Sequence, residues 1–504
     1  MLDNGEIRTS GLAARRPQEL NRDSCTAWVR RYAERVLTRL EVHGFKNLAD
    51  LTVEFGPFTC IAGANGVGKS NVFDAIQFLS LLADHPLMEA AEAVRTTRDE
   101  RTGNPRDLFW SGSSEPTMRF AAEMIVPPQV EDDFGQVVTP SISFLRYELE
   151  IGFAAPGEVD RRGRLVLLAE RLGHINLGEA AGHLNFPHSS KDFRQDVVFG
   201  RRSGVAFIST REDGNDRVIT VHQDGGSRGQ PRRASATRAP ATVVSTITVA
   251  DDPTVLAARR EMQSWRRLAL EPTALRTADR YTDPRLMASD GSHLPATLHR
   301  IAMAANGDEP HPVNVYARVA SRLSELIGVS VRELEVDADE TRELFTLRLV
   351  EQSGANIPAR SLSEGTLRFL ALCVLLEDPD VGGVLCMEEP ENGIHPANIP
   401  AMLNLLRDLA VDPDDAPGPE NPVRQVIVNT HSPVVVQVVA PDDLLFATSR
   451  PVEAQDRSVH EVLELRPMRD SWRASRDGAK PIGKADLIPY LTTPPEHQIS
   501  LTEA

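Results

Sequence analysis

Cysteine is scarce in this 504-residue chain, and its few copies are not spaced as a metal or redox motif. Cys25, Cys60, Cys373 and Cys386 form no C-x-x-C pair. Three of them lie in apolar stretches, where a buried and reduced thiol is the ordinary state. The cysteines therefore point away from a disulfide scaffold and from a zinc site.

Long apolar runs and an excess of basic residues are missing as well. No run approaches the roughly 18 apolar residues of a membrane span, and residues 1–24 lack the apolar core of a signal peptide. The formal net charge of −17 argues against a surface coated with basic groups for nucleic acid, although a local basic channel is compatible with it. We therefore expect a cytoplasmic protein without a membrane partner.

The chain is too long for one compact core, so two or three domains are expected. After a polar and flexible N-terminus, alternating apolar residues predict strands over 36–42, 51–55 and 58–62, and a helix follows over 70–82. Further strands are expected over 117–126, 142–151 and 164–172, followed by a hairpin over 204–210 and 217–223. The later elements are helices over 254–270, 294–305 and 313–328 and strands over 329–336, 343–350, 383–389 and 425–430.

Strands and helices alternate at both ends of the chain, which predicts an α/β nucleotide-binding core split by a long insertion. The expected parts are a flexible N-terminus (1–35), an N-terminal lobe (36–94), an insertion of strands then helices that partly continues the core (95–350), a C-terminal lobe (351–450) and a C-terminal extension (451–504).

The segment "GANGVGKS", from Gly63 to Ser70, fits the pattern G-x-x-x-x-G-K-[ST] between a predicted strand and a predicted helix. Small residues let backbone N–H groups wrap a phosphate, while Lys69 reaches its oxygens and the Ser70 hydroxyl is a ligand for Mg²⁺. A glycine-rich turn that only caps a helix is the alternative. The strand before and the helix after it favour a phosphate loop.

Two adjacent acids, Glu388 and Glu389, end the apolar strand in "VLCMEEPENGIHP". Carboxyl ends of parallel strands face the ligand crevice, so both carboxylates should approach the phosphates. One acid can hold Mg²⁺ or its waters while the other orients and deprotonates the attacking water. Without a phosphate loop in the same chain, such a pair would ordinarily be a solvated loop.

Two more segments carry candidate phosphate contacts. "VIVNTHSP" places His431 at another strand end, where it is a candidate sensor of the terminal phosphate, although a histidine beside an apolar face is more often a core residue. In "RSLSEGTLRFLAL", Ser361, Ser363 and Gly365 precede an apolar helix and offer backbone N–H groups to an anion. Ser361 and Glu364 also have capping-box spacing, and both roles are compatible.

The motifs "GANGVGKSN", "LSEGTLRF", "MEEPENGIHP" and "NTHSP", in this order, resemble those of ABC-type ATPases of the RecF, SMC and OLD kind. They are similar in particular to the bacterial AAA family ATPases of the AAA_21 group, as are "LTRLEVHGFKNL" and "WRRLALEPTALR". The resemblance covers about 36–446. It implies an ABC-type P-loop ATPase head, a mixed sheet with flanking helices, split by a long α+β insertion.

The resemblance also implies roles for individual residues, with ATP and Mg²⁺ as the ligands. Glu389 matches the catalytic base and His431 the switch histidine. Ser70 and Glu388 match the Mg²⁺ ligands, although many relatives have Asp in place of Glu388. The expected ATP-binding residues are Gly63, Asn65, Gly66, Gly68, Lys69, Ser70 and Asn71.

"LSEGT" matches the ABC signature "LSGGQ", with Glu364 and Thr366 as departures. In the family this signature contacts the nucleotide of a second head, so Ser363 and Gly365 are expected to bind ATP in trans. The implied partner is a second ATPase head, in a homodimer or higher oligomer. Lys46 and Asn47 match a position that approaches the nucleotide in relatives, whereas no glutamine matches the Q-loop.

The basic stretch that includes Arg228, Arg232 and Arg233 is a candidate nucleic-acid contact, and a solvated mobile loop is the alternative. The region after His431 is too short for the TOPRIM nuclease of OLD-type relatives. We therefore expect an ATPase that couples head closure to DNA or partner sensing, in an anti-phage defence complex whose effector, such as a nuclease, is a separate protein. The alternatives are a RecF-like repair ATPase, an ABC transporter subunit, which the insertion disfavours, and an ATP-locked scaffold with slow turnover.

Overall fold

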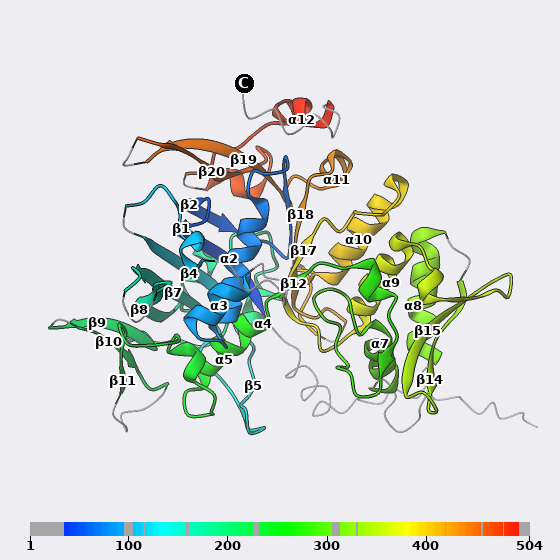
Figure 1. Ribbon diagram of the computed structural model, residues 1–504, viewed down its shortest axis with the longest axis horizontal. Coiled ribbons are helices and arrows are strands. Elements are labelled where there is room, and N and C mark those ends of the chain that lie inside the picture. The colour runs from blue at the N-terminus through cyan, green and yellow to red at the C-terminus, as the bar shows by residue number, and fades with distance from the viewer. Residues whose placement is uncertain are drawn as a thin grey trace, which may run out of the picture.

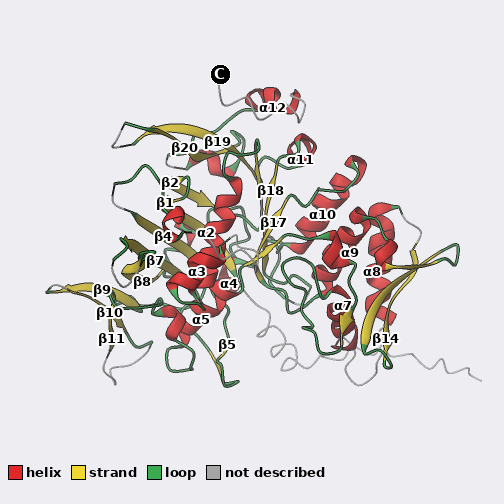
Figure 2. Cartoon of the chain, viewed as in Figure 1, coloured by secondary structure: helices red, strands yellow, loops and turns green. Residues whose placement is uncertain are grey.

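The computed structural model describes residues 35–94, 104–114, 116–157, 161–214, 216–224, 231–304, 313–328, 331–418, 420–454, 457–476 and 478–492. These residues form an eight-stranded sheet, a six-stranded sheet and two smaller sheets, with helices between and beside them (Figure 1, Figure 2). The predicted mixed α/β fold with flanking helices is confirmed.

The six-stranded sheet has the order β12-β17-β18-β3-β19-β20, and only its last pair is antiparallel. Its strands are β3 (Phe58–Ala62), β12 (Arg266–Leu268), β17 (Gly383–Glu388), β18 (Arg424–Thr430), β19 (Leu444–Glu453) and β20 (Val459–Pro467). Since β3, β17 and β18 run in the same direction, the segments that follow them meet at one edge of the sheet.

The eight-stranded sheet is antiparallel and has the order β11-β10-β9-β8-β7-β4-β1-β2. Its strands are β1 (Val36–Phe45), β2 (Leu48–Glu54), β4 (Thr117–Ile125), β7 (Phe144–Ala154), β8 (Arg164–His174), β9 (Ile208–Asp213), β10 (Asp216–Val221) and β11 (Arg232–Ser235). The sheet thus joins residues from the N-terminal lobe to much of the predicted insertion.

Helix α2 (Lys69–Leu82) packs between the two large sheets. The rings of Phe45 on β1, Phe78 on α2 and Phe120 on β4 lie 5.4–5.9 Å apart between centroids. The same core includes Cys386 on β17 and Ile427 on β18. Apolar contact on both sides therefore holds the N-terminus of α2 at the edge where β3, β17 and β18 end.

A second core joins the helices α7, α8, α9 and α10 to the small sheet β13-β15-β14. Strand β16 pairs with β15. These elements are α7 (Leu294–Ala304), α8 (Val313–Ile327), α9 (Glu364–Glu377), α10 (Ile399–Leu409), β13 (Asp279–Arg280), β14 (Val331–Asp339), β15 (Leu344–Glu351) and β16 (Asn356–Pro358).

The remaining α-helices and strands are short, apart from α5. They are α3 (Leu87–Ala93), α4 (Arg194–Val197), α5 (Pro253–Gln263), α6 (Pro272–Leu275), α11 (Pro433–Val438), α12 (Ile488–Thr492), β5 (Val130–Glu131) and β6 (Val137–Val138). In the part of the chain that the structure describes, no helix has the length and the apolar character needed to cross a membrane.

One predicted helix is wrong. The sequence predicts a helix over 254–270, but α5 ends at Gln263 and Arg266–Leu268 forms β12, parallel to β17. A short apolar run is compatible with the period of a helix and with that of a strand, so the pairing with β17 decides its structure. Cys60, Cys373 and Cys386 are buried free thiols, as predicted, and Cys25 lies outside the described residues.

Candidate functional site

The predicted phosphate loop connects β3 to α2, and two of its glycines adopt conformations that other residues avoid. Gly66 and Gly68 have φ angles of 83° and 99°, in the left-handed region. A Cβ atom on Gly68 would lie 2.1 Å from Nδ2 of Asn47. The loop therefore needs glycine at this position both for its backbone conformation and for close contact with Asn47.

The side chain of Lys69 folds back into this loop. Its Nζ donates hydrogen bonds to the carbonyl oxygens of Gly63 and Ala64, each at 2.7 Å. Burial lowers the pKa of Lys69 to about 8, while the nearby carboxylates of Glu389, Glu391 and Glu388 raise it. At neutral pH the loop therefore encloses a protonated ammonium group, which suits an anionic ligand.

Asparagine side chains flank the N-terminus of α2 on two sides. On one side, Asn429 at the end of β18 donates from Nδ2 to Oγ of Ser70, at 3.4 Å. On the other side, Asn71 donates to Oδ1 of Asn47 at 2.7 Å, and Asn47 donates to the carbonyl oxygen of Val67 at 3.0 Å. The first turn of the helix and its loop are thus tied to β18 and to the β1–β2 turn.

The Glu388 carboxylate forms an ion pair that the sequence analysis did not anticipate. Its Oε1 lies 3.0 Å from the Arg267 guanidinium, which also lies 3.1 Å from the fully buried carboxylate of Asp74 on α2. Lys46 approaches the other Asp74 oxygen at 2.7 Å. Arg267 reaches Glu388 and Asp74 because β12 pairs with β17 as a strand. The helix predicted over 254–270 gives no indication of this pairing.

Glu389 occupies a strained backbone position with φ of 45°. Its backbone N–H donates to the carbonyl oxygen of Asn429 at 3.0 Å and to Oδ1 of the same residue at 3.2 Å. Its Oε1 lies 2.6 Å from Nδ1 of His431, and its Oε2 accepts a hydrogen bond from Asn392 at 2.7 Å. These contacts hold the carboxylate in one orientation at the end of β17.

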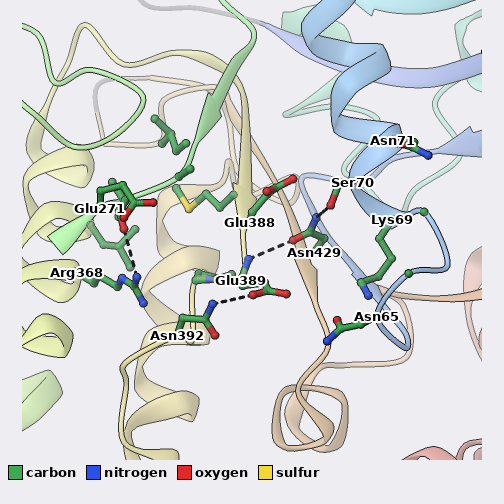
Figure 3. Close-up of a pocket in the computed structure, with 18 residues that line it drawn as sticks. Asn65, Lys69, Ser70, Asn71, Glu271, Arg368, Glu388, Glu389, Asn392 and Asn429 are labelled. Atoms are coloured by element: carbon green, nitrogen blue, oxygen red, sulfur yellow. Dashed lines mark hydrogen bonds between the residues drawn. The ribbon is translucent and has the colours of Figure 1, made fainter. Parts of the chain in front are cut away.

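A cavity of about 480 Å³ unites these residues (Figure 3). In Figure 3, Lys69 and Ser70 lie across the cavity from Glu388 and Glu389. The predicted residues in its lining are Asn65, Gly66, Gly68, Lys69, Ser70, Asn71, Glu388 and Glu389. Gly63 and His431 are outside this lining, but they contact it through Lys69 and Glu389.

The cavity also contains residues that the sequence analysis missed, namely Glu271, Arg368, Asn392 and Asn429. Glu271 lies three residues after the end of β12. A strand prediction for 266–268 would have drawn attention to it. Asn429 had a visible signal, since it precedes His431 by two residues at the end of the predicted strand 425–430.

A further acid, Glu391, is buried and 7% exposed. It accepts a hydrogen bond from the Thr430 hydroxyl, and burial raises its pKa. Tyr490 on α12 donates from its hydroxyl to the backbone carbonyl of His431 at 2.6 Å. The C-terminal segment therefore supports the backbone that carries His431.

Ser363 and Gly365 are not part of the lining of this cavity. Ser363 is the N-cap of α9 and accepts a hydrogen bond from the backbone N–H of Thr366 at 3.2 Å. The expectation of a cap at Ser361 is wrong, because Ser361 lies in a preceding 3-10 turn. The N-terminus of α9 thus presents an exposed serine outside the lining of the cavity.

The predicted nucleic-acid contacts lie elsewhere. Arg232 and Arg233 are exposed on β11, an edge strand of the eight-stranded sheet, and Arg232 forms an ion pair with Asp252. Arg228 lies outside the described residues. Neither described arginine lines the cavity of the phosphate loop.

The donor set near the loop fits a Mg²⁺ ion. Ser70 offers a hydroxyl oxygen and Glu388 a carboxylate, and hard cations such as Mg²⁺ select oxygen ligands. Oε1 of Glu388 is buried and accepts no hydrogen bond among the described residues, although Arg267 neutralises its charge.

Two family models match the chain. The model described as "AAA domain, putative AbiEii toxin, Type IV TA system", AAA_21, matches residues 242–437, and a second AAA domain model, AAA_23, matches residues 39–84. These two segments include the predicted phosphate loop, the signature segment, the acid pair and His431.

Curated relatives and solved structures give further matches. The chain is 45% identical over 145 residues to the DNA replication and repair protein RecF of Limosilactobacillus reuteri. The matched segment covers 28% of this chain and 30% of the relative. The chain is 26% identical over 200 residues to the chromosome partition protein Smc of Bacillus subtilis, covering 38% and 16%. A crystal structure of the SmcHead bound to the C-winged helix domain of ScpA has a TM-score of 0.43 at 14% identity, covering 85% of this chain and 98% of that one.

The chain spans less than a third of the curated relatives that it matches. The family models and the RecF and Smc relatives confirm the resemblance to ABC-type ATPases of the RecF and SMC kind.

Proposed function

We propose that this chain binds ATP with Mg²⁺ and hydrolyses it to ADP and phosphate. The observation that carries the proposal is one cavity in which Lys69 and Ser70 face Glu388 and Glu389. A phosphate loop and two carboxylates at neighbouring strand ends are the parts that phosphoryl transfer to water requires. The AAA domain models that match this chain support the same activity.

The phosphates bind at the N-terminus of α2. Backbone N–H groups of the loop from Gly63 to Gly68 and the positive end of the helix attract the anion. Lys69 exchanges its hydrogen bonds to the carbonyl oxygens of Gly63 and Ala64 for contacts with phosphate oxygens. Ser70 and Glu388 would hold Mg²⁺, which screens phosphate charge when it is bound.

Hydrolysis requires a base beside the terminal phosphate, and Glu389 is the proposed base. A water oxygen bonds to the γ-phosphorus, the bond from that phosphorus to the bridging oxygen breaks, and the water proton passes to the Glu389 carboxylate. His431 and Asn392 hold this carboxylate in position through its two oxygens. Asn429 fixes the backbone of Glu389, so the base stays in place despite its strained conformation.

Two heads close on each other in the proposed cycle. Ser363 and Gly365 lie outside the cavity of their own chain, yet they form the exposed start of the 14-residue helix α9. A helix start of this kind favours an anion. We assign it to the γ-phosphate held by a second head, so that ATP stabilises a homodimer or a higher oligomer.

The biological role that we propose is partner or DNA sensing in a cytoplasmic anti-phage defence complex with a separate effector, such as a nuclease. The words "toxin" and "TA system" in the description of the matching family model support this role. A RecF-like role in DNA repair is the second candidate, supported by the similarity to DNA replication and repair proteins RecF. In either role, we propose that Arg232 and Arg233, which lie among the described residues, contact DNA.

Phosphate release by the purified protein, with and without double-stranded DNA, tests the proposal. We expect Mg²⁺-dependent release that Glu389→Gln abolishes, and stimulation by DNA if DNA is the trigger. Release equal in the wild type and in Glu389→Gln would contradict the assignment of the base. Stimulation by DNA that is unchanged in Arg232→Ala/Arg233→Ala would contradict the proposed DNA contact.

A further inference from the structure

Neither phosphate binding nor the proposed hydrolysis step uses Arg267 on β12, although this residue contacts the site. Its guanidinium lies between two carboxylates from different elements. Nη2 lies 3.0 Å from Oε1 of Glu388 at the end of β17, and Nη1 donates to Oδ1 of Asp74 on α2 at 3.1 Å. Nη1 also lies 3.3 Å from the acceptor Oε1 of Gln77 on the same helix. Arg267 therefore links the strand that carries the acid pair to the helix that follows the phosphate loop.

We infer that Arg267 is a positioning residue of the metal site. It holds the carboxylate of Glu388 and cancels its charge, and it thereby lowers the affinity of the nucleotide-free protein for a divalent cation. The inference rests on the proposed function, because it assumes that Ser70 and Glu388 hold Mg²⁺ beside ATP. It adds the residue that sets how strongly Glu388 attracts a cation before nucleotide binds.

Four side chains form a row of alternating charge from the β1–β2 turn to the cavity. Lys46 approaches Oδ2 of Asp74 at 2.7 Å. Arg267 approaches the other oxygen of Asp74 and then reaches Glu388. Asp74 is fully buried, and a buried carboxylate needs a cation close to it. Since Lys46 supplies one such cation, the positive charge of Arg267 also serves Glu388, and the row has two charges of each sign.

The charges around the cavity balance when Arg267 is counted. Among the described residues, the lining contains three acidic side chains and two basic ones, namely Glu271, Glu388 and Glu389 against Lys69 and Arg368. Arg267 is outside the lining but pairs with Glu388, which brings the total to three of each sign. A site without an excess of negative charge attracts a divalent cation weakly. The phosphates of a nucleotide would supply the missing negative charge.

Strand pairing and burial fix the position of Arg267. In the parallel register of β12 and β17, Arg267 lies opposite Cys386, two residues before Glu388. The side chains of Arg267 and Glu388 are only 20% and 24% exposed. Solvent and salt screen such a pair less than a surface pair, so its effect on a nearby cation is larger.

A purely structural role for Arg267 leads to the opposite expectation. If Arg267 only compensated the charge of buried Asp74, its loss would disturb α2 and the phosphate loop, and cation binding would weaken. If Arg267 restrains Glu388, its loss frees a carboxylate that lies across the cavity from Ser70, and cation binding becomes tighter (Figure 3). The direction of the change therefore separates the two roles.

The test measures the binding of Mn²⁺ to the nucleotide-free protein by electron paramagnetic resonance, since Mn²⁺ accepts the oxygen ligands that Mg²⁺ accepts. We expect Arg267→Gln to bind Mn²⁺ on the order of tenfold more tightly than the wild type, because one positive charge beside the ligand is removed. Arg267→Lys retains the charge and should bind Mn²⁺ as the wild type does. The double variant Arg267→Gln/Glu388→Gln should lose the gain, because the freed carboxylate is absent.

Two further variants complete the experiment. Arg318→Gln is the matched control, since it removes an arginine from an ion pair with Glu377 on α9 and should leave Mn²⁺ binding unchanged. Lys46→Gln leaves β12 intact and removes one cation from the same row, so it should also bind Mn²⁺ more tightly, by a smaller factor. It decides the question if thermal unfolding shows that Arg267→Gln does not fold.

Three results would overturn the inference: no gain in whichever of Arg267→Gln and Lys46→Gln folds, an equal gain in Arg267→Lys, or a gain that persists in the double variant. The first would leave Arg267 as a structural counter-ion of Asp74, and the last would place the cation away from Glu388. Failure of the wild type to bind MgATP in a separate isothermal titration would instead overturn the proposed function itself.

Discussion

Oε1 of Glu389 and Nδ1 of His431 lie 2.6 Å apart, although 42 residues separate them in the sequence. The contact joins the ends of β17 and β18, two parallel neighbours in the six-stranded sheet. It occupies one carboxylate oxygen of Glu389, and Asn392 occupies the other. The two partners therefore decide where the carboxylate points, and movement of His431 would reorient the proposed base.

Replacement of Glu389 by Gln should separate ATP binding from ATP hydrolysis. Gln keeps the shape of the side chain but cannot take a proton from water, so we expect turnover to fall by roughly a hundredfold to ten thousandfold. Closed dimers should then accumulate, because ATP persists between the heads. Light scattering of Glu389→Gln with and without ATP and Mg²⁺ measures this, and a mass that ATP does not change would contradict ATP-driven closure.

Lys69→Ala should remove ATP binding. The change deletes the ammonium group that the loop encloses and with it the charged contacts to phosphate oxygens, so we expect affinity to fall by roughly a hundredfold or more. Isothermal titration with MgATP measures the effect. Lys480→Ala is the control, since Lys480 is an exposed lysine paired with Glu464. If both variants bind MgATP with equal affinity, the assignment of the phosphate loop is wrong.

Ser363→Asp distinguishes a capping role from a role in a second head. Asp caps a helix as well as Ser does, so the stability of α9 should be retained. A new negative charge facing a partner's γ-phosphate should prevent closure while ATP binding to the open head stays normal. The measurement is the mass of the double variant Glu389→Gln/Ser363→Asp with ATP and Mg²⁺.

The control for this measurement is Ser353→Asp in the Glu389→Gln background, because Ser353 lies in an exposed turn. It should form dimers with ATP as Glu389→Gln does. If the Ser363→Asp double variant also forms them, Ser363 only caps α9 and the proposed contact in trans is wrong.

Glu261 makes stability depend on pH. Burial raises the pKa of Glu261 to about 7 from its ordinary value of 4.5. Because this pKa is raised in the folded state, the contribution of Glu261 to the free energy of unfolding is complete below pH 4.5. It is lost as the pH rises through about 7. The neutral variant Glu261→Gln keeps an acceptor for Nε1 of Trp265 and does not titrate.

Relative to the wild type, Glu261→Gln should therefore gain stability, by about 2 kcal/mol, between pH 5 and pH 8. Thermal unfolding at both pH values measures the change, with Glu420→Gln, at an exposed position, as the control. A difference between variant and wild type that is the same at both pH values would show that Glu261 does not titrate in this range.

The local parts of the site were predictable from the sequence. Strand β3, the loop from Gly63 to Gly68 and helix α2 follow from spacing and from backbone conformations that only glycine adopts readily. Glu388, Glu389 and His431 follow from their places at the ends of apolar strands. Such features depend on neighbours within a few residues, which the sequence displays directly.

The contacts between distant segments were decided by the tertiary structure. The sequence does not show that residues 266–268 form a strand rather than the end of a helix, so the pairs of Arg267 with Glu388 and Asp74 stayed hidden. Trp110 and His460 likewise meet only because β20 returns beside the β1–β2 turn. Periodicity determines which residues form a strand or a helix when the run is long, but the packing of the whole chain determines which strand lies beside which, and hence which side chains meet.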